Sequence, residues 1–246
     1  MNTPTLLAVR GLTLAAPDRL LVEGVDVTVC EAKVTALCGP SGSGKSLTAR
    51  AAMAVLDVSP GLRAGTLHYP ALQGDRDWFA GVAGGGTASQ AQLLKDTAHL
   101  RGSYLSYSPQ TASSALNPGR TIGRQMEMAI QRRIEPSREP VGKLVLALLA
   151  EVGLAPYVSG SLPGELSGGM CQRAALAIAM ASAPRVLIAD EPETGLDPVL
   201  RRQVVELLVA VGKAHRCGIL LISHHEDTVS RIADDVVRFS SPAEAE

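Results

Sequence analysis

The sequence predicts an α/β protein built around a phosphate-binding loop, and three observations lead to this prediction. Short apolar segments at 33–39 and 185–190 have the composition of buried parallel strands. A glycine-rich turn follows the first of these segments, and acidic residues end the second. Segments of helical composition come next, at 46–56 and 198–214. With 246 residues, the chain can form one or two domains with a proper hydrophobic core.

The predicted strands gather at the two ends of the chain. Residues 6–16 and 20–29 alternate apolar and polar side chains, as half-buried strands do, and we expect them to form an N-terminal antiparallel β portion. A short strand is predicted at 66–69, after a stretch punctuated by glycine and proline. Two more are predicted near the C-terminus, at 218–223 and 236–239.

Most of the predicted helices lie between these strands. Helical patterns between residues 121 and 152 precede a helix that Ser167 would cap and that runs to about residue 182. The sequence therefore predicts a helical subdomain at 111–182, inserted into an α/β core formed by residues 1–110 and 183–246. All of these parts would belong to one domain that spans residues 1–246.

The composition argues against several classes of function. The 23 basic and 24 acidic residues give a formal net charge of −1, which does not fit a nucleic-acid binder or a polybasic membrane anchor. Aromatic residues make up only 3% of the chain, so a stacking platform for bases is not expected. No apolar run reaches the roughly 18 residues of a membrane-spanning helix, and the N-terminus lacks a secretory signal pattern. The widely spaced cysteines fit reduced thiols in the cytosol.

The glycine-rich turn after the first apolar segment matches the phosphate-loop pattern GxxxxGK(S/T). It consists of Gly39, Pro40, Ser41, Gly42, Ser43, Gly44, Lys45 and Ser46. Its glycines let the backbone curl around phosphate, and the helix that follows adds the positive end of its dipole. Lys45 would reach the β- and γ-phosphates, and the Ser46 hydroxyl would ligate Mg²⁺. The turn predicts a nucleoside triphosphate with Mg²⁺; the alternative is a turn that matches by chance.

Two acidic residues follow the apolar residues 186–189. Because a strand end beside a phosphate loop is where a second acid is needed, Asp190 would hold Mg²⁺, directly or through water. Glu191 would polarise the attacking water, since its neighbour is committed to the metal. The alternative is an acidic pair that caps a helix.

The most specific segment of the chain is residues 166–173, with the sequence LSGGMCQR. At the start of a helix, Ser167, Gly168 and Gly169 offer a hydroxyl and unhindered backbone amides to an anion. One phosphate loop does not need a second anion site of this kind, so the segment is predicted to serve the nucleotide of another subunit. The alternative is an ordinary serine N-cap followed by flexible glycines.

These motifs resemble those of the ATP-binding subunits of ABC transporters, over nearly the whole chain. Five elements stand in the order of that family: the phosphate loop, a Q-loop glutamine at Gln110, the signature at 166–173, the Walker B strand at 186–191 and a switch histidine at His224. Residues 194–197, with the sequence TGLD, resemble the D-loop. The resemblance implies a P-loop NTPase core of ABC type with an N-terminal antiparallel β portion and an inserted helical subdomain.

The resemblance also implies that ATP and Mg²⁺ are bound between two subunits that meet head to tail. The signature residues would contact the γ-phosphate on the partner, and Asp197 would couple the two sites. Gln110 would contact Mg²⁺ or the attacking water and signal to the membrane subunits, and His224 would contact the γ-phosphate. Glu191, His224 and Gln110 would thus be the catalytic residues. Taken alone, Gln110 and His224 would be surface polar residues.

Within this family the chain resembles the ATPases of peptide and nickel importers, and most of all the nickel-importer ATPase. The similar segments are SSALNP at 113–118, TIG at 121–123, the Met in the signature and LLISHHEDTVSRIADDV at 220–236. Peptide import and import of an opine- or metallophore-bound metal are the alternatives. Such a chain would lie at the cytoplasmic face of the inner membrane as a peripheral subunit. Its partners would be a second ATPase subunit that is a distinct homologue, two permease subunits and, indirectly, a periplasmic or surface substrate-binding protein, without nucleic acid.

Two other functions fit the phosphate loop less well. A soluble ABC ATPase that acts on DNA or ribosomes would need a long coiled-coil insertion or a second ATPase domain, together with a basic surface, and the sequence shows none of these. A small-molecule kinase would leave the signature segment without a role. The chain also departs from the family pattern: no aromatic residue precedes the phosphate loop, and Glu193 replaces a common Thr or Ser.

Overall fold

The computed structural model describes residues 3–72, 76–111, 115–194 and 196–240. Backbone contacts divide the chain into two compact units: unit one is residues 1–101 with 218–246, and unit two is residues 102–217. Among the described residues, no helix combines the length and the hydrophobicity needed to cross a bilayer. Three parts of the sequence prediction lie outside the described residues: the two serines at 113–114, the D-loop glycine at 195 and the tail beyond 240.

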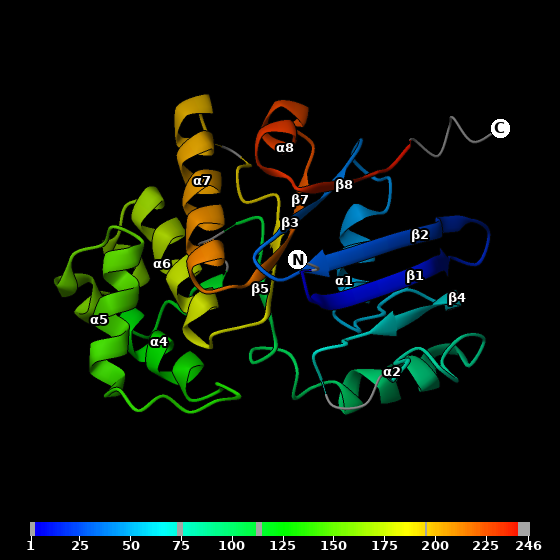
Figure 1. Ribbon diagram of the computed structural model, residues 1–246, viewed down its shortest axis with the longest axis horizontal. Coiled ribbons are helices and arrows are strands. Elements are labelled where there is room, and N and C mark those ends of the chain that lie inside the picture. The colour runs from blue at the N-terminus through cyan, green and yellow to red at the C-terminus, as the bar shows by residue number, and fades with distance from the viewer. Residues whose placement is uncertain (1–2, 73–75, 112–114, 195, 241–246) are drawn as a thin grey trace. The chain divides into compact units, whose positions relative to one another are not determined.

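Unit one contains an antiparallel sheet with the strand order β2-β1-β4 (Figure 1). The strands are β1 (Thr5–Ala15), β2 (Leu20–Cys30) and β4 (Gly61–His68). The predicted N-terminal antiparallel portion is therefore confirmed. β4 begins earlier than the predicted strand and contains Gly65, which lies close to β1. Gly65 has φ +121°, and a Cβ there would lie 2.9 Å from the Cα of Leu12.

The other strands of unit one are parallel, and β3 (Val34–Cys38) lies between β7 (Gly218–Ser223) and β8 (Asp235–Arg238). Every residue of β3 and β7 is buried, so neither strand shows the alternation of a half-exposed strand. Helices α1 (Lys45–Ala52) and α8 (Glu226–Ile232) pack against them. Another helix of this unit, α2 (Gly86–Asp96), contacts β4.

The described residues of unit two include a pair of parallel strands, several helices and two short 3₁₀ turns. The strands are β5 (Leu105–Ser108) and β6 (Val186–Asp190), and the turns are Pro156–Gly160 and Pro163–Glu165. The helices are α4 (Ile122–Ile130), α5 (Val141–Glu151), α6 (Gly168–Ala181) and α7 (Pro198–Ala214). In Figure 1, α4, α5 and α6 lie side by side, and α6 packs its alanine-rich surface into the core of this unit.

The helix-rich block of the sequence prediction is thus present as α4, α5 and α6. The compact units follow backbone contacts and join this block with β5, β6 and α7. They do not test the predicted subdomain boundaries, so the division into a core at 1–110 and 183–246 and an insertion at 111–182 stays a prediction.

We predict that Gly218→Ala destabilises the fold, because a Cβ at this position would lie 2.7 Å from both the carbonyl oxygen of Cys30 and Cγ1 of Val29. Overpacking of this kind costs about 1–3 kcal/mol of the free energy of unfolding. The control is Gly142→Ala on α5, where a Cβ would meet nothing within 4 Å and alanine improves helix propensity. Urea unfolding measures both variants, and equal effects would contradict the prediction.

Candidate functional site

The predicted phosphate loop connects β3 to α1 within unit one. Its glycines Gly39, Gly42 and Gly44 have φ angles of +151°, +79° and +98°, which favour glycine. At Gly44 a Cβ would lie 2.7 Å from the carbonyl oxygen of Leu21, so no larger residue fits without a shift. Gly44 is also the N-cap of α1 and provides no side-chain cap for the first amides of the helix. This N-terminus, which is followed by Lys45 and Ser46, is an electropositive cradle for an anion.

Two polar side chains in the loop fit a phosphate group. Nζ of Lys45 donates to the carbonyl oxygens of Gly39, at 2.9 Å, and Pro40, at 2.7 Å, and the side chain is buried. These neutral acceptors satisfy hydrogen bonds but do not balance the buried positive charge, which an anion would do. Oγ of Ser43 is buried and has no hydrogen-bond partner among the described residues. Exposed Ser41 and half-buried Ser46 complete the loop.

The strand register places the predicted switch histidine at the same sheet edge as the phosphate loop. Cys38 of β3, the last residue before the loop, pairs with Ser223 of β7, the last residue before His224. The exposed His224 ring lies 4.0 Å from the ring of His225, between centroids. The backbone amide of His225 donates to Oγ of Ser223 at 3.0 Å, which fixes this turn.

The two predicted acidic residues end β6 in unit two. Asp190 is the last residue of the strand and half-buried, and its Oδ2 accepts a hydrogen bond from the Tyr107 hydroxyl at 2.9 Å. Glu191 follows with φ +46°, a conformation that a non-glycine residue adopts at some cost in strain. The chain therefore turns out of the strand direction at Glu191, which is the residue predicted to act as the base.

The structure brings Gln110 and Glu191 together. Oε2 of Glu191 accepts hydrogen bonds from Nε2 of Gln110, at 3.2 Å, and from the Thr194 hydroxyl, at 3.0 Å. Since the amide nitrogen of Gln110 faces Glu191, its amide oxygen is the atom suited to a cation. Carboxylate, amide and hydroxyl oxygens, as on Asp190, Gln110 and Ser46, are the hard donors that Mg²⁺ prefers. The donor chemistry of the predicted metal ligands therefore fits Mg²⁺.

The signature residues lie at the exposed N-terminus of α6. Oγ of Ser167 accepts from the amide of Met170 at 3.3 Å, which confirms the predicted N-cap. Gly168 and Gly169 are exposed, and a Cβ at either would meet nothing within 4 Å. Burial raises the pKa of the Cys171 thiol, which therefore stays protonated and poorly nucleophilic. The contact of this helix end with another subunit's nucleotide stays a prediction.

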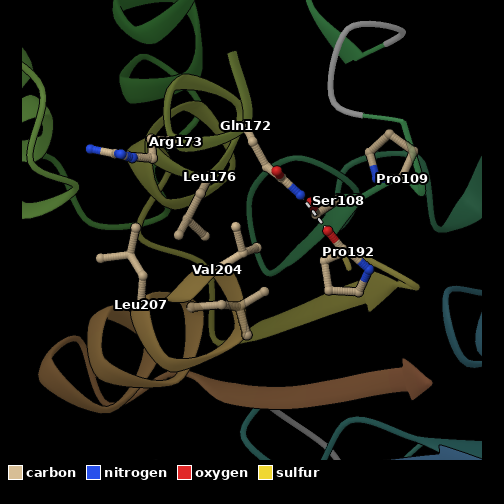
Figure 2. A pocket seen from close by; sticks show the side chains of 9 residues that line it. Ser108, Pro109, Gln172, Arg173, Leu176, Pro192, Val204 and Leu207 are labelled. Atoms are coloured by element: carbon tan, nitrogen blue, oxygen red, sulfur yellow. Dashed lines mark hydrogen bonds between the residues drawn. The ribbon is translucent and has the colours of Figure 1, made fainter. Parts of the chain in front are cut away.

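Further along the signature, Gln172 ties α6 to the turn after β6. Its Nε2 donates to the carbonyl oxygen of Pro192, as the dashed line in Figure 2 shows. Beside this hydrogen bond, apolar side chains of α6 and α7, including Leu176 and Val204, line a pocket (Figure 2). The residue next to Pro192, Glu193, is fully buried.

Asp197, predicted to couple two nucleotide sites, caps α7 in the structure. Its Oδ1 accepts from the backbone amides of Val199, at 2.9 Å, and Leu200, at 3.1 Å. This capping is a structural role. The proposed coupling across a subunit interface stays a prediction.

Sequence reasoning missed three contacts at or beside the predicted site: Tyr107 with Asp190, Thr194 with Glu191, and Gln172 with Pro192. The motifs contain Thr194 and Gln172, but a motif does not show which side chain contacts which. Tyr107 contacts Asp190 only because β5 pairs in parallel with β6, and β5 itself was not predicted. Its four residues include two serines, so the strand lacks an apolar run.

A sequence model of the family described as ABC transporter matches residues 22–194. The chain belongs to the ABC transporter family. It is 31% identical to the metal-staphylopine import system ATP-binding protein CntD of Staphylococcus aureus, over 95% of this chain and 82% of that protein. It is 33% identical to the oligopeptide transport ATP-binding protein AppD of Bacillus subtilis, over 88% of this chain and 62% of that protein.

Solved structures give the same result for the fold. The structure of a bacterial ABC transporter cassette, MJ0796, which is dimeric, superposes with a TM-score of 0.70 and 18% identity, over 95% of this chain and 94% of that chain. The predicted P-loop NTPase fold of ABC type is therefore confirmed. Together with family membership, the fold makes this ABC protein an ATP-binding and ATP-hydrolysing domain.

We predict that Lys45→Met weakens ATP binding about 10- to 100-fold, which corresponds to the ~1.5–3 kcal/mol of hydrogen bonds made by a charged group. Isothermal titration with a non-hydrolysable ATP analogue measures this affinity. The matched control is Lys33→Met, which removes an exposed lysine paired with Asp234 at 2.7 Å and should leave nucleotide affinity unchanged. If both variants bind the analogue like the parent protein, the lysine in the loop does not hold phosphate.

Proposed function

We propose that this ABC ATPase is the ATP-hydrolysing subunit of an importer and energises uptake of nickel, free or chelated. The observation that carries the hydrolytic part is the hydrogen bond between Gln110 and Glu191 at the ends of β5 and β6. It joins a residue suited to sense a bound cation to the residue suited to activate water. The importer part is supported by relatives named for metal-staphylopine import and oligopeptide transport.

The described side chains divide the chemistry among them. Lys45 and the loop amides bind the phosphates, and Ser46, Asp190 and Gln110 supply oxygens for Mg²⁺. Mg²⁺, when bound, neutralises charge on the transferred phosphoryl group. Glu191 accepts the proton of the attacking water, and the hydrogen bond from Thr194 keeps its carboxylate oriented.

His224 completes this division of roles. Its position after β7, at the edge where the phosphate loop begins, suits a hydrogen bond to the γ-phosphate. The ring is exposed, whereas the strand that precedes it is buried along its whole length.

The exposed helix end at Ser167, Gly168 and Gly169 supports a head-to-tail arrangement of two ATPase subunits. A capped helix N-terminus with two unhindered glycines can approach a phosphate that belongs to another chain. Asp197 would couple the two sites. We propose that the second subunit is a distinct homologue, and that both bind two permeases at the cytoplasmic face of the inner membrane. A substrate-binding protein outside would deliver the cargo.

Import of a di- or oligopeptide, or of a metal bound to a metallophore, is the second candidate. The similarity to CntD favours a chelated metal and the similarity to AppD favours a peptide, at nearly equal identity. The ATPase domain does not decide between them, because the cargo passes through the permeases.

We predict that Glu191→Gln traps an ATP-bound dimer, because glutamine preserves the shape of the side chain but cannot take the proton of water. Size-exclusion chromatography with Mg-ATP, of the chain alone and with its homologous ATPase, measures the dimer. Adding Ser167→Ala should dissociate it. The matched control is Thr121→Ala, which removes the equivalent N-cap of α4, a hydrogen bond of 3.3 Å from the backbone amide of Arg124. This variant should leave the dimer intact. Hydrolysis at the parent rate by Glu191→Gln would refute the assigned base.

The cargo is tested by uptake. Cells that lack this chain are complemented with the parent protein or with Lys45→Met, and uptake of radioactive nickel and of a labelled tripeptide is compared. We expect the parent protein, but not the variant, to restore nickel uptake. Restoration of tripeptide uptake alone would support the second candidate. Nickel uptake that requires an added metallophore would identify a chelated metal as cargo.

A further inference from the structure

We propose that Tyr107 is a positioning residue for Mg²⁺ binding, because its hydroxyl orients the carboxylate of Asp190. The inference rests on the metal-binding role proposed for Asp190, and it adds a residue that none of the motifs contains. Tyr107 lies on β5 and Asp190 ends β6, both within unit two.

The parallel register explains how the two side chains meet. Tyr107 pairs with Ile188, two residues before Asp190. Because side chains alternate along a strand, Ile188 and Asp190 point to the same face, and Tyr107 points to that face as their neighbour. A tyrosine is long enough to lean along the strand and reach the next residue on this face. Its hydroxyl donates to Oδ2 of Asp190 at 2.9 Å.

The chemistry of this hydrogen bond favours an ordered metal ligand. A phenol hydroxyl that donates to an ionised carboxylate fixes the rotation of the carboxylate plane. Asp190 and Tyr107 are both half-buried, so water competes less for this contact than it would at the surface. Hydrogen bonds from outer-shell residues to metal ligands typically account for about 10- to 100-fold in metal affinity or activity.

Tyr107→Phe removes the hydroxyl and keeps the ring, so it tests the two parts of the side chain separately. Tyr107 lines a pocket together with Leu116, Arg132 and Ile178, and phenylalanine has nearly the same volume as tyrosine. The variant therefore removes the hydrogen bond to Asp190 and leaves the apolar surroundings in place.

The experiment measures the affinity of the full chain for a non-hydrolysable ATP analogue with Mg²⁺ and with EDTA. The ratio of the two dissociation constants is the gain that the metal provides. We expect Tyr107→Phe to reduce this gain about 10-fold and to leave binding in EDTA unchanged. ATP turnover should require more Mg²⁺, and part of the lost turnover should return at saturating Mg²⁺. An unchanged metal gain would overturn the proposal.

The control for loss of a tyrosine hydroxyl is Tyr69→Phe. Tyr69 is buried in unit one, and its hydroxyl donates to the carbonyl oxygen of Ala52 at 2.9 Å. This variant loses a comparable hydrogen bond without contact to Asp190, so its metal gain should match the parent protein. A reduced gain in both variants would show a general effect of destabilisation and would contradict a specific role of Tyr107.

Asp190→Asn distinguishes failure of this inference from failure of the proposed function. If Asp190→Asn lowers the metal gain and Tyr107→Phe does not, only the role of Tyr107 is wrong. If Asp190→Asn has no effect, the assignment of Asp190 as a metal ligand is wrong as well. In the double variant, Tyr107→Phe should add nothing, because the tyrosine acts through Asp190. An additional loss in the double variant would mean that Tyr107 does not act by positioning Asp190.

Discussion

Parallel pairing of short strands is the constraint on which both units of this ABC ATPase depend. β3 and β7 are buried along their whole length and β6 is buried up to its last residue, so polar side chains are tolerated mainly where a strand ends. β5, which pairs with β6, is buried only at its first two residues. Since parallel strands share a direction, their carboxyl ends lie at one edge. This pairing places His224 beside the start of the phosphate loop in unit one, and Gln110 beside Glu191 in unit two.

In the turn after β6, backbone and side-chain hydrogen bonds fix the position of Glu191. Glu191 leaves the strand in a left-handed conformation that would relax if nothing opposed it. The amide of Thr194 donates to the carbonyl oxygen of Glu191 at 3.0 Å, and its hydroxyl donates to the carboxylate. Pro192 follows Glu191, and its carbonyl oxygen accepts a hydrogen bond from the side chain of Gln172 on α6. The position of α6 and the orientation of Glu191 therefore depend on the same short turn.

The sequence allowed prediction of those features that depend on local pattern or on a contiguous motif. The N-cap at Ser167, the bounds of α7 and the buried strands follow from periodicity and capping residues. Features that depend on the exact register between strands were missed, and so was β5. β5 has only four residues, and Gly65 could be recognised as a contact point in β4 only once Leu12 was placed opposite. The contact of Tyr107 with Asp190 spans 83 residues and requires the register.

Capping and ligand binding call for the same residue types at a helix N-terminus, so the motif alone cannot separate them at Ser167 or Asp197. The two glycines of the signature favour ligand binding over capping alone. A cap needs no glycine at the first helical positions, and glycine is a poor helix former. A Cβ at Gly168 or Gly169 would meet nothing within 4 Å, so packing within this chain does not exclude a side chain there. This openness is compatible with the predicted approach of a nucleotide bound to a second subunit, and that contact stays a prediction.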